Sequence, residues 1–270
     1  MKKILVTLVL GVLLFPGCND ELAVVYRPLD SVDYVIFQEV AQNDTVLLVL
    51  PDGLTHDIDP DEELASKLVF FPYNVVLVHQ AQTKDPELSK QYYMSEEEAQ
   101  DINDFSIDIL LRTINHFKDE GNHVIVFGDY VGSFLALRSI VRDGMIADSY
   151  VLLNGRLDVE EEIIQIAEEL RVAILDGEEI FQNGYIVNRE NWVDYRLLGN
   201  LVTPRYTEEL SDLNLSSLLY TYRDENDDLG PLRTPEINFL TNGGATVIGF
   251  PGSFDWNGYE YYALLDFARQ

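Results

Sequence analysis

The stretch Val124-Ile-Val-Phe-Gly-Asp-Tyr-Val-Gly-Ser133, followed by Phe134-Leu-Ala-Leu-Arg-Ser-Ile-Val-Arg142, determines how the rest of the chain is interpreted. Its first half is a continuous apolar run, which is typical of a strand covered on both faces of a parallel sheet. Gly128 and Gly132 flank Tyr130, and such small residues leave room for a strained backbone. The pattern therefore predicts a buried strand, a sharp turn with Tyr130 at its apex, and a helix.

This turn resembles the nucleophile elbow, G-x-Nu-x-G, which raises one side chain above the end of a parallel sheet. The segment Gly128-Asp-Tyr-Val-Gly132 keeps both glycines, and Val131 and Gly132 open the helical side of the turn. Tyr130, however, stands where a hydrolase carries Ser, Cys or Asp. We expect an elbow that is present and a nucleophile that is missing.

The other segments alternate between short apolar runs and amphipathic ones. Residues 22–27 and 34–40 predict a hairpin or meander at the sheet edge, and residues 44–50, 74–78, 149–153, 218–222 and 245–250 predict further strands. Ser95 and Glu98 predict a capped helix start, and five apolar residues follow near helical spacing: Ile102, Phe105, Ile109, Ile114 and Phe117. Helices are also predicted at 159–170, 234–241 and 259–268, the first of them within a charged, mostly helical interval at 156–216.

This order of elements, with an elbow on the fifth strand and an insertion after the sixth, resembles the α/β-hydrolase fold. The resemblance covers nearly the whole mature chain. It implies a single α/β domain over residues 24–270, with a mostly parallel sheet flanked by helices and a helical lid at 156–216. A different doubly wound fold with the same strand, turn and helix is the alternative.

The resemblance also implies where the partners of a nucleophile would lie. The acidic loop after the seventh strand is where the family carries its catalytic acid, and Asp227 is the best match, with Asp224 and Asp228 beside it. The loop Pro251-Gly-Ser-Phe-Asp255 resembles the family's Pro-Gly-x-Gly-His turn, so Asp255 stands in the position of the histidine. Two members of the triad are therefore replaced.

The chemistry of these residue types argues against covalent acyl transfer. A tyrosine hydroxyl has a pKa of about 10, which nearby carboxylates raise further. A carboxylate such as Asp255, with an ordinary pKa of about 4, is several units too weak a base for an alcohol. Asp52 and Gly53 fall where the loop that carries an oxyanion-hole amide would lie. We expect the triad-equivalent positions Tyr130, Asp227 and Asp255 to be inactive.

An active esterase-like or peptidase-like hydrolase with an atypical catalytic set is the alternative. It would use Ser133 or Ser253 as nucleophile and His79 as base. Against it, Ser133 is explained by packing of the helix on the strand, and His79 by a solvated or hydrogen-bonded position in a loop. A third class, a structural subunit of an envelope complex, predicts a large exposed apolar patch on the lid.

No cofactor or metal site is predicted. Neither G-x-G-x-x-G nor a Walker-type loop occurs, and His56, His116 and His123 do not group as metal ligands. The run Asp57-Ile-Asp-Pro-Asp61 lacks the twelve-residue calcium-loop pattern, so we interpret it as a solvated charge run.

The N-terminus reads as a targeting segment. Lys2 and Lys3 precede an apolar run that is too short to span a membrane comfortably, and it ends at Pro16-Gly-Cys18. This resembles a bacterial lipoprotein site, with a signal peptide at 1–17 and a lipidated Cys18 that begins a short tether at 18–23; an ordinary signal peptide is the alternative. The following Asn19-Asp-Glu21 resembles the surface-export signal of Bacteroidota lipoproteins. We expect an outer-membrane lipoprotein of the cell envelope, with surface exposure as an extension of that prediction.

The chain is strongly acidic. Its formal charge is −29, and loss of residues 1–17 removes two lysines and no acid, giving −31. Such a surface repels nucleic acid and favours cations or saline surroundings, of which adaptation to salt is the simpler account. The sequence therefore predicts a membrane-anchored protein that has lost its hydrolase chemistry and binds a small molecule or an envelope protein.

Overall fold

The computed structural model describes residues 33–40, 42–50, 72–85, 88, 94–153, 156–159, 180–182, 185–187, 192–223 and 232–250. Several predicted sites lie outside these residues: Cys18, Asp52, Gly53, His56, Asp224, Asp227, Asp228, Ser253 and Asp255. So do the predicted strand at 22–27, the run 57–61, the helix at 259–268 and nearly all of the helix at 159–170.

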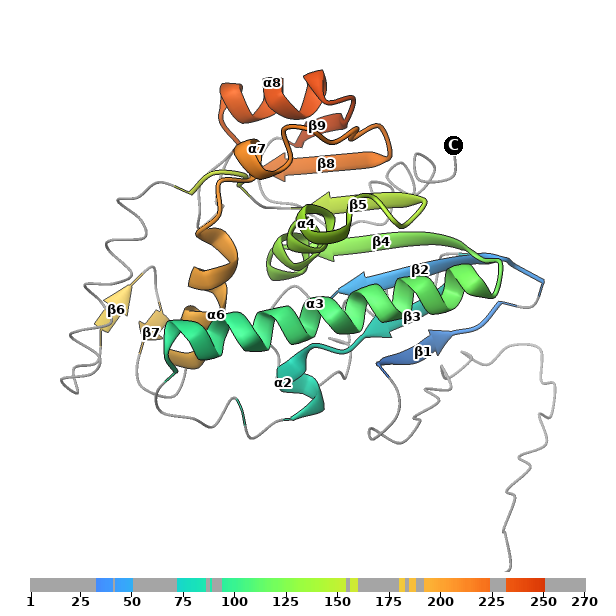
Figure 1. Cartoon of the computed structure of the whole chain (residues 1–270), viewed down its shortest axis with the longest axis horizontal. Helices are drawn as coiled ribbons and strands as arrows, with labels where there is room; N and C mark the ends of the chain where they lie inside the picture. Colours follow the sequence, from blue (N-terminus) through green and yellow to red (C-terminus); the bar gives the residue numbers. More distant parts are fainter. Residues whose placement is uncertain are drawn as a thin grey trace, which may run out of the picture.

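A seven-stranded sheet forms the centre of the molecule, in the order β1-β3-β2-β4-β5-β8-β9 (Figure 1). β1 pairs antiparallel with β3, and the other neighbouring strands pair in parallel. This confirms the predicted mostly parallel sheet with an early strand at its edge. The strand bounds are β1 Tyr34–Gln38, β2 Thr45–Leu50, β3 Asn74–Val78, β4 His123–Asp129, β5 Ser149–Leu153, β8 Leu218–Arg223 and β9 Thr246–Phe250.

The inner strands are buried on both faces. In β2, Val46 and Leu48 belong to the core that the helices cover, whereas Leu47 and Val49 point to the opposite face and are equally buried. Successive residues of a strand point to opposite faces, so burial of both faces requires an unbroken apolar run. That requirement explains why the sequence of these strands shows no polar alternation.

Two long helices, α3 (Glu96–Asp119) and α4 (Val131–Asp143), lie along one face of the sheet (Figure 1). The predicted capping box opens α3: Ser95 Oγ accepts a hydrogen bond from Glu98 N at 3.2 Å, and Glu98 Oε2 accepts one from Ser95 N at 2.8 Å. These contacts satisfy two N–H groups that helix geometry leaves without a partner. Two shorter helices are α2 (Ala81–Lys84) and α8 (Thr234–Asn242).

The five apolar residues at near-helical spacing do not all lie on the buried face of α3. Ile109, Ile114 and Phe117 are buried and Ile102 is partly buried, but Phe105 is 43% exposed. Phe105 precedes Ile114 by nine residues, which is about two and a half turns of helix, so the two side chains leave opposite sides of it. Near-helical spacing was therefore an insufficient guide to the buried face.

The described part of the interval 156–216 holds strands as well as the predicted helices. It contains α6 (Trp192–Val202) and the short α7 (Tyr206–Glu209), but also an antiparallel pair of strands, β6 (Ile180–Gln182) and β7 (Tyr185–Val187). The sequence between these strands is Asn-Gly, the dipeptide most typical of a two-residue hairpin, and the interpretation overlooked it. The role of this interval as a lid stays a prediction.

Helix α6 is held against α3 by a buried amide. Asn103 Nδ2 donates to Leu197 O at 3.0 Å and to Asn200 Oδ1 at 2.9 Å.

Among the residues that the structure describes, no helix is both long and apolar enough to cross a membrane.

Candidate functional site

The backbone at the end of β4 turns sharply into α4. Tyr130 lies between the two elements with φ 45° and ψ −104°, a conformation that non-glycine residues rarely adopt. Tyr130 N donates to Leu153 O at 3.0 Å, and Tyr130 O accepts from Ser133 N at 3.0 Å. Neighbouring contacts thus hold the strained turn that the sequence predicted.

Gly128 is required by the closeness of this turn. A Cβ atom at Gly128 would lie 2.6 Å from Gly132 O and 2.8 Å from Ser133 N, closer than non-bonded atoms can approach. The obstacle is backbone, which cannot rotate away as a side chain can. The first glycine of the motif is therefore explained by contact with the start of α4.

The helical side of the turn carries main-chain donors. Val131 and Gly132 occupy the first turn of α4, where helix geometry offers their N–H groups no intrahelical acceptor. The helix dipole adds partial positive charge at the same place. Tyr130 itself packs edge-on against Phe134, with ring centroids 6.5 Å apart. The site combines amide donors with a partly exposed phenol.

Ser133 is not arranged as a nucleophile. Its side chain is fully buried, with Oγ 2.7 Å from Leu153 O and 2.9 Å from Gly128 O, and Oγ accepts a bond from Leu153 N at 3.1 Å. The hydroxyl thus ties α4 to the ends of β4 and β5. The packing interpretation of Ser133 accounts for every one of these contacts.

His79 follows β3 and is buried rather than solvated. Its Nδ1 lies 2.9 Å from Thr83 Oγ1. Thr83 gives its single hydroxyl proton to Gln80 O at 2.9 Å, so Nδ1 must be the donor in the pair and Nε2 carries the lone pair. Burial, with a smaller contribution from nearby Lys84, lowers the pKa of His79 to about 4. The imidazole is therefore neutral and a weak base near pH 7.

A charged cluster lies beside His79. Asp33 pairs with Lys84 at 2.7 Å and with Arg112 of α3 at 2.7 Å. Burial opposes the charge on Asp33, but the hydrogen bonds from Arg112 and Lys84 outweigh it and leave its pKa below the usual range. These ion pairs fix α2 against α3 and thereby fix the end of β3.

A second polar structure follows β5, and we call it the clasp: residues 156–158 with Glu236 of α8 and Thr207 of α7. Glu236 Oε1 accepts from the N–H groups of Leu157 and Asp158, both at 2.9 Å, and Oε2 lies 3.6 Å from the Arg156 guanidinium. Asp158 in turn accepts from Thr207 N at 3.2 Å. The clasp joins the two ends of the interval between β5 and α7.

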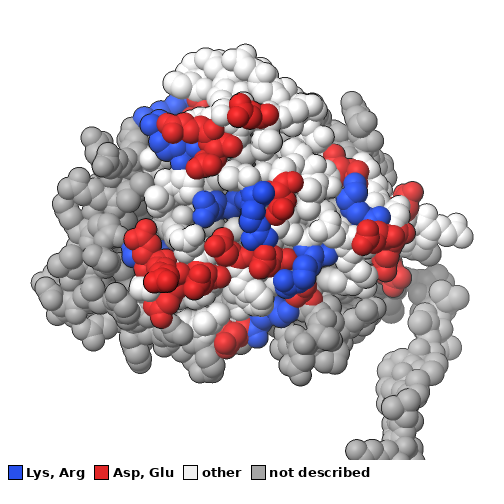
Figure 2. Space-filling model, in the orientation of Figure 1, with Lys and Arg blue, Asp and Glu red and all other residues white. Residues whose placement is uncertain are grey.

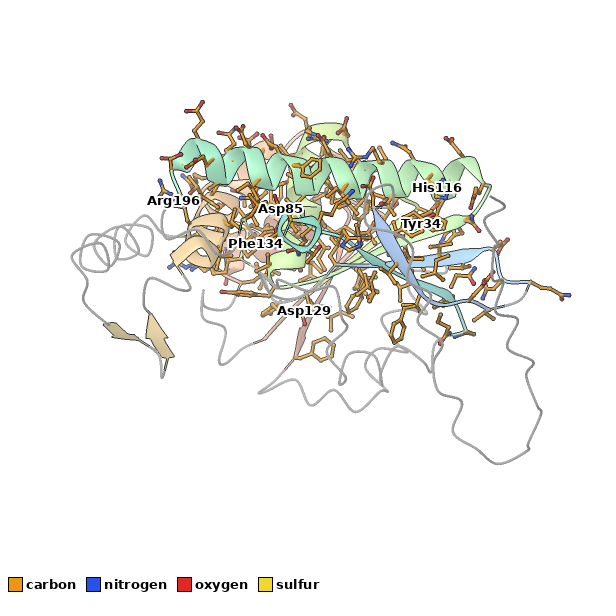
Figure 3. All side chains as sticks on the ribbon, turned by 90° about the horizontal axis from the view of Figure 1, so that it is seen from below. Tyr34, Asp85, His116, Asp129, Phe134 and Arg196 are labelled. Carbon is orange, nitrogen blue, oxygen red and sulfur yellow. The ribbon has the colours of Figure 1, made fainter. Side chains whose placement is uncertain are left out.

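The other described features lie apart from the elbow. His116 stacks on Tyr34 at the far end of α3, as Figure 3 shows, and His123 lies 3.9 Å from Asp148. A surface hollow of about 330 Å³ is bounded by charged residues that pair with one another, among them Asp108 and Arg142. Within the described ranges, no group of three or more His, Cys, Asp or Glu could hold a metal ion.

Charge is mixed on the face that carries α3. Figure 2 shows Lys and Arg interspersed with Asp and Glu, and acidic side chains gather over the first half of α3. The exposed acids of this helix include Glu96, Glu97 and Asp101. Acids in the first turn complement the helix dipole, so part of this charge has a structural explanation.

No protein-family model matches the chain, and no curated protein matches its sequence. Solved structures match its shape. MGS-M2, an α/β-hydrolase enzyme from a Medee basin deep-sea metagenome library, is 16% identical, with a TM-score of 0.57 over 88% of this chain and 94% of that one. MenH from S. aureus is 15% identical, with a TM-score of 0.56 over 88% and 98% of the two chains. The chain has the α/β-hydrolase fold.

A monoglyceride lipase variant from Saccharomyces cerevisiae also shares the α/β-hydrolase fold, at 11% identity and a TM-score of 0.53 over 94% of this chain and 95% of that one. Identities this low establish the fold and leave the activity open. β4 is a central parallel strand that ends in a sharp turn to a helix, and the assignment of Tyr130 to the nucleophile position of the fold stays a prediction.

Sequence reasoning missed two groups of buried polar residues. One is the buried set after β3, Gln80, Gln82 and Thr83; the other is the carboxylate of Glu236. A run such as His-Gln-Ala-Gln-Thr directly after an apolar strand is unusually polar for a buried position, and that was the available signal. Glu236 in the first turn of α8 was indistinguishable from an ordinary helix-start acid.

Proposed function

We propose that the chain is a lipoprotein of the bacterial cell envelope, anchored through Cys18, in which an α/β-hydrolase fold has lost Ser-His-Asp chemistry. It binds a ligand or a protein partner around Tyr130. The observation that carries the proposal is the backbone of Tyr130 at φ 45° and ψ −104°. A strained elbow has been kept although its side chain is a phenol.

Strain at a non-glycine residue costs about 1–3 kcal/mol and tends to persist at functional positions. A phenol with an ordinary pKa of about 10 is a poor acyl acceptor at neutral pH, but it is a good hydrogen-bond donor. The amides of Val131 and Gly132 add two further donors beside it. This set supports binding of an acceptor group rather than its covalent capture.

The loss of chemistry is tested by hydrolysis of short acyl p-nitrophenyl esters. We expect the purified wild-type protein to be inert, and Tyr130→Ser combined with Asp255→His to gain turnover above either single variant. Esterase activity in the wild type would contradict the proposal.

The second candidate function, an active hydrolase, now depends on Ser253 with His79. Ser133 is committed to the backbone of β4 and β5, and the Nδ1 of His79 faces a threonine rather than an orienting carboxylate. Activity in the wild type that Ser253→Ala or His79→Ala abolishes would establish this candidate. Ser139→Ala is the matched control, because Ser139 is a buried serine on α4 that bonds only locally, to Ala136 O at 2.7 Å.

The anchor is tested separately from the site. We expect metabolic labelling with an alkyne fatty acid to mark the wild-type protein and not Cys18→Ser. Labelling that survives Cys18→Ser, or membrane association without any label, would contradict anchoring through this cysteine while leaving the proposal for the elbow intact.

A further inference from the structure

Gln80 directly follows the His79 position and is almost completely buried, at 1% exposure. Its Oε1 accepts a hydrogen bond from Gln82 Nε2. Its Nε2 has no hydrogen-bond partner among the residues that the structure describes. A buried donor without a partner is unfavourable, and native proteins seldom retain one without a reason.

The sheet register brings Gln80 level with the elbow. β2 lies between β3 and β4; Leu50 of β2 pairs with Gly128, and Val49 pairs with both Leu77 and Phe127. Continuing these pairings by one residue at a time sets Val78 level with Gly128, and therefore Gln80 level with Tyr130. Gln80 is still extended, with φ −103° and ψ 167°, so the strand direction holds to this residue.

The two residues also share one side of the sheet. Gln80 has the same alternation as Val76 and Val78, which belong to the core beneath α3 and α4, and Tyr130 packs against that same core. Level residues two strands apart are separated by about 10 Å at their Cα atoms. A small molecule that meets the amides of Val131 and Gly132 can span that distance.

We propose that the Gln80 side-chain amide donates a hydrogen bond to a bound ligand. The ligand is a neutral carbonyl compound with two acceptor oxygens. The first accepts from the amides that open α4, and the second accepts from Gln80 Nε2–H. The assignment rests on the proposed function, since it needs a ligand at the elbow. Every group named is a donor, so the ligand supplies acceptors. A neutral ligand fits better than a carboxylate because the formal charge of −29 repels anions.

The test uses two ketones that no hydrolase can cleave, 2-octanone and 2,7-octanedione, which share a chain length and differ by one carbonyl. Dissociation constants come from ligand-observed NMR with the purified protein. We expect the dione to bind wild type about five-fold more tightly, the effect of one net hydrogen bond of about 1 kcal/mol. Gln80→Met should abolish this preference and bring the ratio of the two dissociation constants to about one.

A second variant and a control keep the result interpretable. Gln80→Glu retains an acceptor for Gln82 but presents a carboxylate to the ligand, so it should also lose the dione preference. Asn103→Leu removes another buried amide, one whose donor nitrogen is fully used, and should leave the preference at five-fold.

Three outcomes distinguish the possibilities. A dione preference that survives both Gln80 variants overturns this inference; if Tyr130→Ala then weakens both ketones, the proposed function stands without it. Equal binding of the two ketones by wild type also overturns the inference. Failure of wild type to bind either ketone overturns both the inference and ligand binding at the elbow.

Discussion

The elbow and the clasp lie at the ends of neighbouring strands and treat polar groups in opposite ways. In the clasp, the Glu236 carboxylate accepts from three backbone N–H groups, including that of Arg233 at 2.7 Å, and faces a guanidinium. At the elbow, the backbone of Tyr130 is strained and the nearby Gln80 donor is buried without a partner within the described residues. The clasp is built for stability, whereas the elbow retains unfavourable features that folding alone does not require.

The largest expected effect concerns the elbow backbone. Gly128→Ala would drive Cβ into Gly132 O at 2.6 Å, so either the turn opens or the variant fails to fold. We expect a loss of about 4 kcal/mol or more in the free energy of unfolding, measured by urea denaturation. Gly199→Ala is the control, because no atom lies within 4 Å of its added Cβ in α6; it should be neutral or stabilising by up to about 1 kcal/mol.

If Gly128→Ala matched Gly199→Ala in stability, the turn would not be as tight as described, and the contrast between elbow and clasp would fail at its strongest point. Ligand binding by a stable Gly128→Ala variant would count further against a requirement for the strained turn.

The clasp provides the next largest effect. Glu236→Gln leaves Arg156 buried beside a neutral amide and sets an N–H₂ group against the N–H of Arg233. Removing one partner of a buried ion pair typically costs about 3–5 kcal/mol, and the retained amide oxygen should keep the loss near 3. Thermal and urea unfolding measure it. Glu208→Gln, an exposed acid on α7, should change stability by less than about 0.5 kcal/mol.

A loss in Glu236→Gln no greater than in Glu208→Gln would show that the clasp contributes little to stability. Faster protease cleavage of Glu236→Gln between β5 and α7 would further support a stabilising role for the clasp, since the clasp joins both ends of that interval.

The buried histidine beside the elbow predicts a pH dependence. The pKa of His79 falls from an ordinary 6.5 to about 4, so below pH 6.5 the unfolded chain binds a proton that the folded protein does not. Stability is therefore full above pH 6.5 and is lost as pH falls toward 4, by about 3 kcal/mol. Asp33, which faces this histidine, has a lowered pKa and stays charged across the window.

His79→Asn should flatten the profile between pH 6.5 and 4.5, because the amide nitrogen can still donate to Thr83 and does not titrate. Equilibrium unfolding in urea at several pH values measures this. An unchanged slope in His79→Asn would assign the acid sensitivity to other groups.

The fold was predictable from sequence because it depends on repeated patterns. Strands buried on both faces must be continuously apolar, and a capping box marks a helix start, so β5 was predicted at its observed bounds and α3 at its first residue. Phe105 is exposed although it shares the near-helical spacing, because approximate spacing does not fix the direction of a side chain around the helix. The hairpin of β6 and β7 was missed because its Asn-Gly signal lay in a charged interval interpreted as helical.

The site was predictable only in part, for a different physical reason. The elbow is local in sequence, so Gly128, Tyr130 and Gly132 could be recognised together. The position of Gln80, two strands away from them, depends on the insertion of β2 between β3 and β4, which is a property of strand order rather than of any local pattern. The backbone N–H groups that Glu236 binds likewise belong to Leu157 and Asp158, which precede it by 79 and 78 positions in the sequence.

The smallest predicted effect tests whether the elbow is strained at all. Tyr130→Gly and Tyr130→Ala both remove the ring contact with Phe134, so their difference isolates the backbone. At φ 45° a glycine has no Cβ to clash, and we expect Tyr130→Gly to be more stable than Tyr130→Ala by about 1 kcal/mol. At an ordinary helical position the order reverses, as a Leu198→Gly and Leu198→Ala pair in α6 would show. If alanine were the more stable residue at 130 as well, the turn would carry no strain, and the elbow would have to be explained, like the clasp, by packing alone.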